Sequence, residues 1–147
     1  MLPSTTARVP LHTPPRYNEA IRRQTEENVA RYANEPTAIE RRLAELDREW
    51  DIERTLEANA ATVALIGVGL GAFVDRRLLA LPALVCGFLL QHALQGWCPP
   101  VPLFRHLGVR TAREIDEERY ALKALRGDFR PTSPGGDAEQ ALRAVRR

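Results

Sequence analysis

Apolar residues are concentrated in the middle of the chain, between residues 58 and 104, where charged side chains are almost absent. The first run is ANAATVALIGVGLGAFV, the charged turn Asp75-Arg76-Arg77 follows, and the second run is LLALPALVCGFLLQHALQGWCPPVPLF. Two apolar runs joined by a charged turn are typical of a membrane-spanning helical hairpin, because a helix satisfies its own backbone hydrogen bonds in lipid. We therefore predict an all-α fold centred on a two-span transmembrane hairpin over residues 58–111.

The two predicted spans differ in how well their length and apolar character fit a membrane-spanning helix. Residues 58–74 would reach about 26 Å as a helix, near the lower limit for about 30 Å of hydrocarbon. Residues 78–97 are more apolar, and the three prolines that follow Gly96 forbid any continuation of the helix. Both runs contain small residues at helical spacing, which lets membrane helices approach closely. These helix-packing candidates are Ala60, Ala64, Gly67 and Gly71 on the first helix, and Ala83 and Gly87 on a second small face turned toward it.

The segments before the hairpin are polar. Residues 1–16 are rich in proline and are predicted to be a disordered tail. Residues 17–57 are predicted to form polar and amphipathic cytoplasmic helices, the second of which runs from Ala38 without a break into the apolar segment. Its apolar stripe consists of Ile39, Leu43, Leu46 and Trp50. This stripe is interpreted as a helix–helix contact or, alternatively, as a membrane-surface contact.

The segments after the hairpin are polar as well. Residues 112–127 are predicted to form an amphipathic helix with Ile115, Leu122 and Leu125 on its apolar side. Residues 128–147 are predicted to be a flexible C-terminal tail that contains one short basic helix.

The distribution of charge predicts the orientation of the chain but indicates no chemical activity. The 147 residues carry a net charge of +2, too weak and too dispersed to predict nucleic-acid binding. No cleaved signal peptide is apparent, so the internal segments would insert into the membrane. More arginines flank the hairpin than lie in its turn, which predicts that both termini are cytoplasmic. The predicted location is the bacterial inner membrane.

The residues Gly96-Trp97-Cys98-Pro99, followed by Leu107-Gly108-Val109-Arg110-Thr111, resemble the YgaP-like transmembrane domain family of bacterial inner membranes. The resemblance covers residues 59–111 and implies a two-helix hairpin with Gly96, Trp97, Cys98 and Pro99 as its signature turn. In that family the hairpin can anchor a rhodanese domain and can form a dimer. This chain has no room for a rhodanese domain, so the resemblance implies no sulfur transfer.

Two residues are candidates for chemistry. Cys98 could be a redox or persulfide-accepting thiol, and His92 could mark a polar path in the membrane. The alternative is structural: Cys98 belongs to a turn, and His92, six residues earlier, is expected on a different helix face. No catalytic residue, metal site or cofactor is predicted.

The sequence therefore predicts a non-enzymatic anchor or scaffold in contact with the lipid bilayer. It would dimerise through its small-residue faces, and its amphipathic helices would bind each other or a cytoplasmic protein partner. One alternative is a membrane thiol protein that handles sulfur or redox equivalents through Cys98. A second alternative is a soluble helical bundle that acts as an interaction protein.

Overall fold

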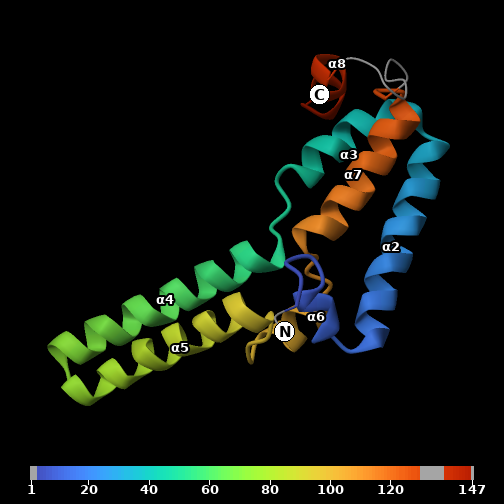
Figure 1. Ribbon diagram of the computed structural model, residues 1–147. Coiled ribbons are helices and arrows are strands. Elements are labelled where there is room, and N and C mark those ends of the chain that lie inside the picture. Colours follow the sequence, from blue (N-terminus) through green and yellow to red (C-terminus); the bar gives the residue numbers. More distant parts are fainter. Residues whose placement is uncertain (1–2, 130–137, 147) are drawn as a thin grey trace. The chain divides into compact units, whose positions relative to one another are not determined.

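The computed structural model describes residues 3–129 and 138–146, and within these ranges the chain is helical and has no strand (Figure 1). The predicted all-α fold is therefore confirmed for this part of the chain. The helices divide into two compact units. The first unit contains the described residues up to Ile21 together with Trp50–Arg113. The second contains Arg22–Glu49 and the described residues from Glu114 onward.

The first unit is built around two long helices that lie side by side (Figure 1). Its elements are α1 (Arg8–Leu11), the start of α2 (Pro15–Ala33), α4 (Ile52–Phe73), η2 (Arg76–Leu79), α5 (Ala80–Gln95) and α6 (Val101–His106). The 22 residues of α4 extend about 33 Å at about 1.5 Å per residue. The 3₁₀ turn η2 leads directly into α5, so residues 76–95 form a second apolar element of comparable length.

The helix α4 has an N-cap residue of its own, Asp51. Asp51 has an extended backbone, and its side chain accepts a hydrogen bond of 2.7 Å from the backbone N–H of Arg54. Residues 47–51 are not helical, so the prediction of one helix from Ala38 into the apolar segment is wrong. Asp51 stops that continuation because its carboxylate satisfies an N–H that a continuous helix would bond to a carbonyl.

Small residues allow α4 and α5 to approach closely. A Cβ added at Gly67 would lie 2.7 Å from Cδ of Pro82, and one added at Gly71 would lie 2.5 Å from Cδ2 of Leu79. Both glycines are buried against residues of the same chain, and Ala60 and Ala64 on the same side of α4 are half-buried. The face predicted to mediate dimerisation is therefore occupied within the chain.

The second small face was predicted wrongly. Ala83 and Gly87 are exposed, and a Cβ at Gly87 would have no described atom beyond its own helix within 4 Å. The side of α5 that meets α4 instead carries Pro82 and His92. Residues 82 and 83 point about 100° apart around a helix, so a shift of one position turns the small residues outward.

The N-terminal segment is ordered against the base of this helix pair. Residues 1–16 were predicted to be disordered, but α1 lies within them and Val9 and Thr13 are buried. The Asn18 side chain donates a hydrogen bond of 3.0 Å to the carbonyl of Pro10. The disorder prediction is therefore wrong for the described residues 3–16, because these few contacts compensate for a composition that cannot form a core by itself.

The second unit packs helices around the predicted stripe. It contains η1 (Pro36–Ala38), α3 (Ile39–Leu46), most of α7 (Ala112–Arg126) and α8 (Ala138–Arg146). Ile39, Leu43 and Leu46 form a core cluster with Tyr32, Ala38, Ile115 and Leu122. Trp50 and Leu125 were predicted on the apolar faces but are exposed.

Part of the predicted C-terminal tail is helical. Residues 138–146 form α8, and Nζ of Lys123 donates a hydrogen bond of 3.0 Å to the carbonyl of Val145. The rest of that prediction concerns residues 130–137 and 147, which lie outside the described residues.

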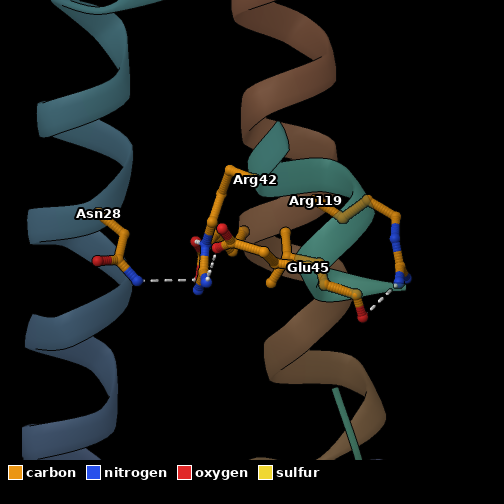
Figure 2. A network of polar contacts seen from close by, with 6 residues as sticks. Asn28, Arg42, Glu45 and Arg119 are labelled. Atoms are coloured by element: carbon orange, nitrogen blue, oxygen red, sulfur yellow. Dashed lines mark hydrogen bonds and ion pairs between the residues drawn. The ribbon is translucent and has the colours of Figure 1, made fainter. Parts of the chain in front are cut away.

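A buried ion pair crosses the second unit. Glu118 on α7 is fully buried and accepts hydrogen bonds from two guanidinium nitrogens of Arg42 on α3, at 2.7 and 3.3 Å. Asn28 on α2 donates a third, at 3.3 Å, and Figure 2 shows its side chain turned toward Arg42. Burial opposes the charged form of Arg42, but the hydrogen bonds to Glu118 and Glu45 outweigh it and raise its pKa.

We expect Gly67→Ala to destabilise the protein by about 1–3 kcal/mol, because the new methyl group would clash with the rigid ring of Pro82. Gly69→Ala is the matched control. It lies two residues away with no described neighbour near its added Cβ, so the higher helix propensity of alanine should leave stability unchanged or raise it by up to ~1 kcal/mol. Denaturant unfolding in detergent, followed by circular dichroism, measures both. Equal effects would contradict the observed packing of α4 on α5.

We expect Arg42→Ala to destabilise the protein by about 3–5 kcal/mol, because it removes the guanidinium that makes two hydrogen bonds to the fully buried carboxylate of Glu118. The exposed neighbour Arg41→Ala is the control and should change stability by less than about 0.5 kcal/mol. A double variant, Arg42→Met with Glu118→Leu, should recover most of the loss because it removes both charges. Unfolding curves of the full chain test this, and a double variant as unstable as Arg42→Ala would contradict it.

Candidate functional site

The most extensive surface feature of the first unit is apolar. Both α4 and the element Arg76–Gln95 are long and apolar enough to cross a membrane. Only 17 % of the most apolar window of α4 and 6 % of that of Arg76–Gln95 are buried. The exposed large side chains on these elements include Leu65, Ile66, Val68, Phe73, Leu84, Leu90 and Leu94. Soluble monomers rarely expose a contiguous apolar surface of more than a few hundred Å², so this face needs an apolar environment.

A polar cluster lies at the end of the helix pair where α4 begins and α5 ends. Oε2 of Glu53 and Nε2 of His92 are 2.8 Å apart, and Oε1 of Glu53 accepts a hydrogen bond of 2.9 Å from Arg8. Arg8 also donates a hydrogen bond of 2.8 Å to the carbonyl of Ala93, in the last turn of α5. The carboxylate at a helix N-terminus and the cation at a helix C-terminus each complement the local helix dipole.

Both candidates for chemistry, His92 and Cys98, are buried. Cys98 is 3 % exposed, His92 is equally buried, and Nδ1 of His92 has no hydrogen-bond partner within the described residues. Cys98 packs in an apolar cluster with Val9, Ile52, Leu56 and Val101. The helix-face argument does not apply to this pair, because α5 ends at Gln95 and Cys98 lies beyond the helix.

Gly96 gives the signature turn its shape. It ends α5 in the left-handed conformation, with φ of 81°, and its N–H donates a hydrogen bond of 2.7 Å to the carbonyl of His92. A Cβ at this position would lie 2.4 Å from the backbone of Arg8. Half-buried Trp97, buried Cys98 and exposed Pro99 follow, and α6 begins at Val101. Glycine is therefore required twice, for its backbone conformation and for the close approach of the N-terminal segment.

A groove runs along one side of the helix pair and reaches Cys98. Its volume is about 520 Å³, and its walls are almost entirely apolar. The lining residues come from α4, α5, the signature turn and α6; they include Ala60, Val63, Leu84, Phe88, Cys98 and Leu103. The groove therefore connects the apolar outer surface with the thiol.

Arg8 and Glu53 were missed by the sequence analysis. Arg8 lies in a segment that was predicted to be disordered, and Glu53 was assigned to the polar flank of the hairpin. The available signal was weak: three acidic residues, Asp51, Glu53 and Glu57, precede the first apolar run, and one histidine lies near the end of the second, so the sequence does not single out Glu53 as the partner of His92. Because antiparallel helices bring those two ends together, a pairing of one of these three residues with His92 could have been inferred. The contribution of Arg8 could not have been inferred.

Comparisons with protein-family models, with curated proteins and with solved structures found no match to this chain. The functional argument therefore depends on the surfaces and contacts described above.

We expect Gly96→Ala to release the N-terminal segment, because its methyl group would overlap the backbone of Arg8. Limited trypsin digestion in detergent, followed by mass spectrometry, should show faster cleavage after Arg8. Gly108→Ala is the matched control: its φ of 83° carries a similar backbone strain, but a Cβ there has no described neighbour within 4 Å. Equal cleavage rates in the two variants would contradict the proposed contact.

Proposed function

We propose that this chain is a small integral membrane protein that acts as a non-enzymatic anchor or scaffold. In this proposal α4 and the η2–α5 element cross the bilayer as a hairpin, and the charged helices remain on one side. The observation that carries the proposal is the uncovered apolar surface of both elements. Contact with lipid acyl chains would cost that surface no free energy, whereas contact with water would.

The dimensions of the helix pair are compatible with this placement. The uncharged part of α4, residues 58–73, extends about 24 Å at about 1.5 Å per residue, which is near the lower limit for a hydrocarbon core of roughly 30 Å. The turn between the helices carries Asp75, Arg76 and Arg77, all exposed, which would reach the aqueous phase on the far side. Asp75 also caps η2 by accepting a hydrogen bond of 2.9 Å from the N–H of Arg77. The turn is therefore suited to lie at a membrane surface.

The polar groups at the opposite end of the helix pair support a hairpin whose two ends lie on the same side of the membrane. Glu53 forms an ion pair with Arg8 and also contacts His92 where the helices would enter the membrane, so its carboxylate is not an isolated charge. More arginines lie near this end than in the turn. The positive-inside rule then puts both termini in the cytoplasm, and the resemblance of the signature turn suggests the bacterial inner membrane.

The scaffold part of the proposal concerns the second unit. Its helices have charged outer faces and a core fixed by the buried pair of Arg42 and Glu118. An ordered charged surface of this kind is suited to bind a cytoplasmic protein partner. Self-association through Gly67 and Gly71 is not part of the proposal, because these residues already contact η2 and α5.

We expect Ile66→Arg to reduce the amount of protein that resists alkaline carbonate extraction. Ile66 is 56 % exposed near the middle of the first span, where arginine costs about 2.5–3.5 kcal/mol on insertion. Leu125→Arg is the matched control; it places the same charge at an exposed leucine of α7, outside both spans, and should extract like the wild type.

The same experiment separates the proposal from a soluble helical bundle. In a soluble protein Ile66→Arg would replace an exposed apolar residue by a polar one and should improve yield in the soluble fraction. Wild-type protein that leaves the membrane with carbonate and purifies without detergent as a monomer would contradict membrane insertion.

A further inference from the structure

We propose that two copies of this chain associate through the second unit, each placing an apolar stripe of its α8 in a groove between α2 and α7 of the other. The proposal names a second copy of the chain as the partner of the second unit. It rests on the proposed scaffold function only in taking that unit as a binding surface. It does not depend on membrane insertion, because the groove and the stripe both lie in the second unit.

The groove is formed by one side of α2 and one side of α7. It has a volume of about 350 Å³, and its walls are mostly apolar. Residues 25–33 of α2 and residues 117–125 of α7 supply its lining, and each stretch is about 12 Å long at about 1.5 Å per residue. Three of the lining residues are alanines, namely Ala30, Ala33 and Ala121. Their short side chains leave room for larger side chains of another helix.

The helix α8 presents an apolar stripe that remains exposed. Ala138, Ala141, Leu142 and Val145 recur at the spacing of one helix face. The two large side chains of this stripe are not covered, since Leu142 is 51 % and Val145 is 44 % exposed. With 9 residues α8 extends about 14 Å, which is close to the length of the groove. One unit therefore carries an exposed stripe and an open groove of similar length.

The stripe of α8 does not reach the groove of its own chain. The carbonyl of Val145 accepts a hydrogen bond of 3.0 Å from Nζ of Lys123 on α7. Lys123 lies two residues from both Ala121 and Leu125, which line the groove, and two residues correspond to about 200° around a helix. The helix α8 is therefore bonded to a residue on the side of α7 that faces away from the groove.

A second copy supplies the stripe that the groove lacks. Each α8 keeps its bond to Lys123 and offers its exposed side to the other copy. Because each copy contributes one groove and one stripe, two identical contacts related by a two-fold axis close the dimer.

The charges of the two surfaces are complementary. Glu26 and Glu117 are exposed among the groove residues. Glu26 lies 3.8 Å from Arg22 of its own helix, whereas Glu117 forms no ion pair within the described residues. The sequence of α8 contains two arginines and one glutamate, so its net charge is 2 − 1 = +1. Opposite charge on the groove and on α8 favours their pairing over the binding of an acidic helix.

The first test measures the mass of the full chain in detergent micelles by light scattering coupled to size-exclusion chromatography. We expect a dimer. Leu142→Arg should raise its dissociation constant about 10-fold or more, because it would bury a charge in an apolar groove. Leu11→Arg is the matched control at an exposed leucine of the first unit and should leave the constant unchanged. Circular dichroism verifies that each variant is folded.

A second pair of variants tests the charge of the groove. Glu117→Arg should raise the dissociation constant about 3–10-fold, because the new cation would repel the positively charged α8. Glu27→Arg makes the same change on α2 at an exposed residue that does not line the groove, and should have no effect. Equal effects of the two variants would contradict the pairing.

Disulfide trapping identifies what occupies the groove. In chains with Cys86→Ala and Cys98→Ala, one copy carries Ala30→Cys in the groove and a differently tagged copy carries Leu142→Cys in the stripe. We expect mild oxidation to join the two tags about 10 times faster than with Ala44→Cys, because docking raises the effective concentration of the two thiols. Ala44 is an exposed alanine of α3 outside the groove. A single chain with both new cysteines that closes the disulfide within a monomer would place α8 in its own groove and overturn the proposal.

Three further results would overturn it: a monomeric mass, a dimer that Leu142→Arg does not weaken, or equal trapping by Ala30→Cys and Ala44→Cys. Because all these measurements are made in micelles, they leave the membrane placement of α4 and α5 untouched. Conversely, release of the protein by carbonate would refute that placement without altering association through the second unit.

Discussion

The structure depends on one constraint: the outer apolar surface of α4 and the η2–α5 element must be kept from water. Within the described residues nothing covers it, since most of both helices' apolar stretches remain exposed. The second unit has a core of its own, built from Tyr32, Ile39, Leu43, Leu46, Ile115 and Leu122. In the proposed placement lipid would remove this cost, and it would account for the charges of the helix pair, which lie in the turn at residues 75–77 and at the opposite end.

That constraint accounts for the polar cluster at the base of the pair. The last carbonyls of a helix have no partner within the helix, and Arg8 donates a hydrogen bond to one of them in α5, that of Ala93. The same guanidinium balances Glu53, which pairs with His92 across the two helices. The N-terminal segment is ordered because Arg8 makes these contacts and because Gly96 leaves room for its backbone. Cys98 follows the turn that Gly96 permits and is buried with Val9, Ile52 and Leu56.

The sequence predicted local features well and long-range ones poorly. Helix type, the charged turn, the end of α5 at Gly96 and the close-packing side of α4 at Gly67 and Gly71 follow from spacing and composition. The rotation of α5 about its own axis does not follow from spacing and composition. Pro82 and Ala83 are adjacent in the sequence, and only the packing of the helices determines which of them faces α4. Contacts between distant segments could not be predicted from the sequence either. Residues 3–16 are ordered because Arg8 and Val9 contact residues that lie more than 40 positions away in the chain.

The central claim is tested most directly at Cys86, which lies near the middle of α5 and is exposed. A nitroxide spin label on Cys86, in the full chain with Cys98→Ala and reconstituted in liposomes, reports its surroundings through power saturation of the electron paramagnetic resonance signal. The account predicts strong relaxation by oxygen, which dissolves in hydrocarbon, and little by a water-soluble nickel chelate. Strong relaxation by the nickel chelate would place α5 in water and contradict it.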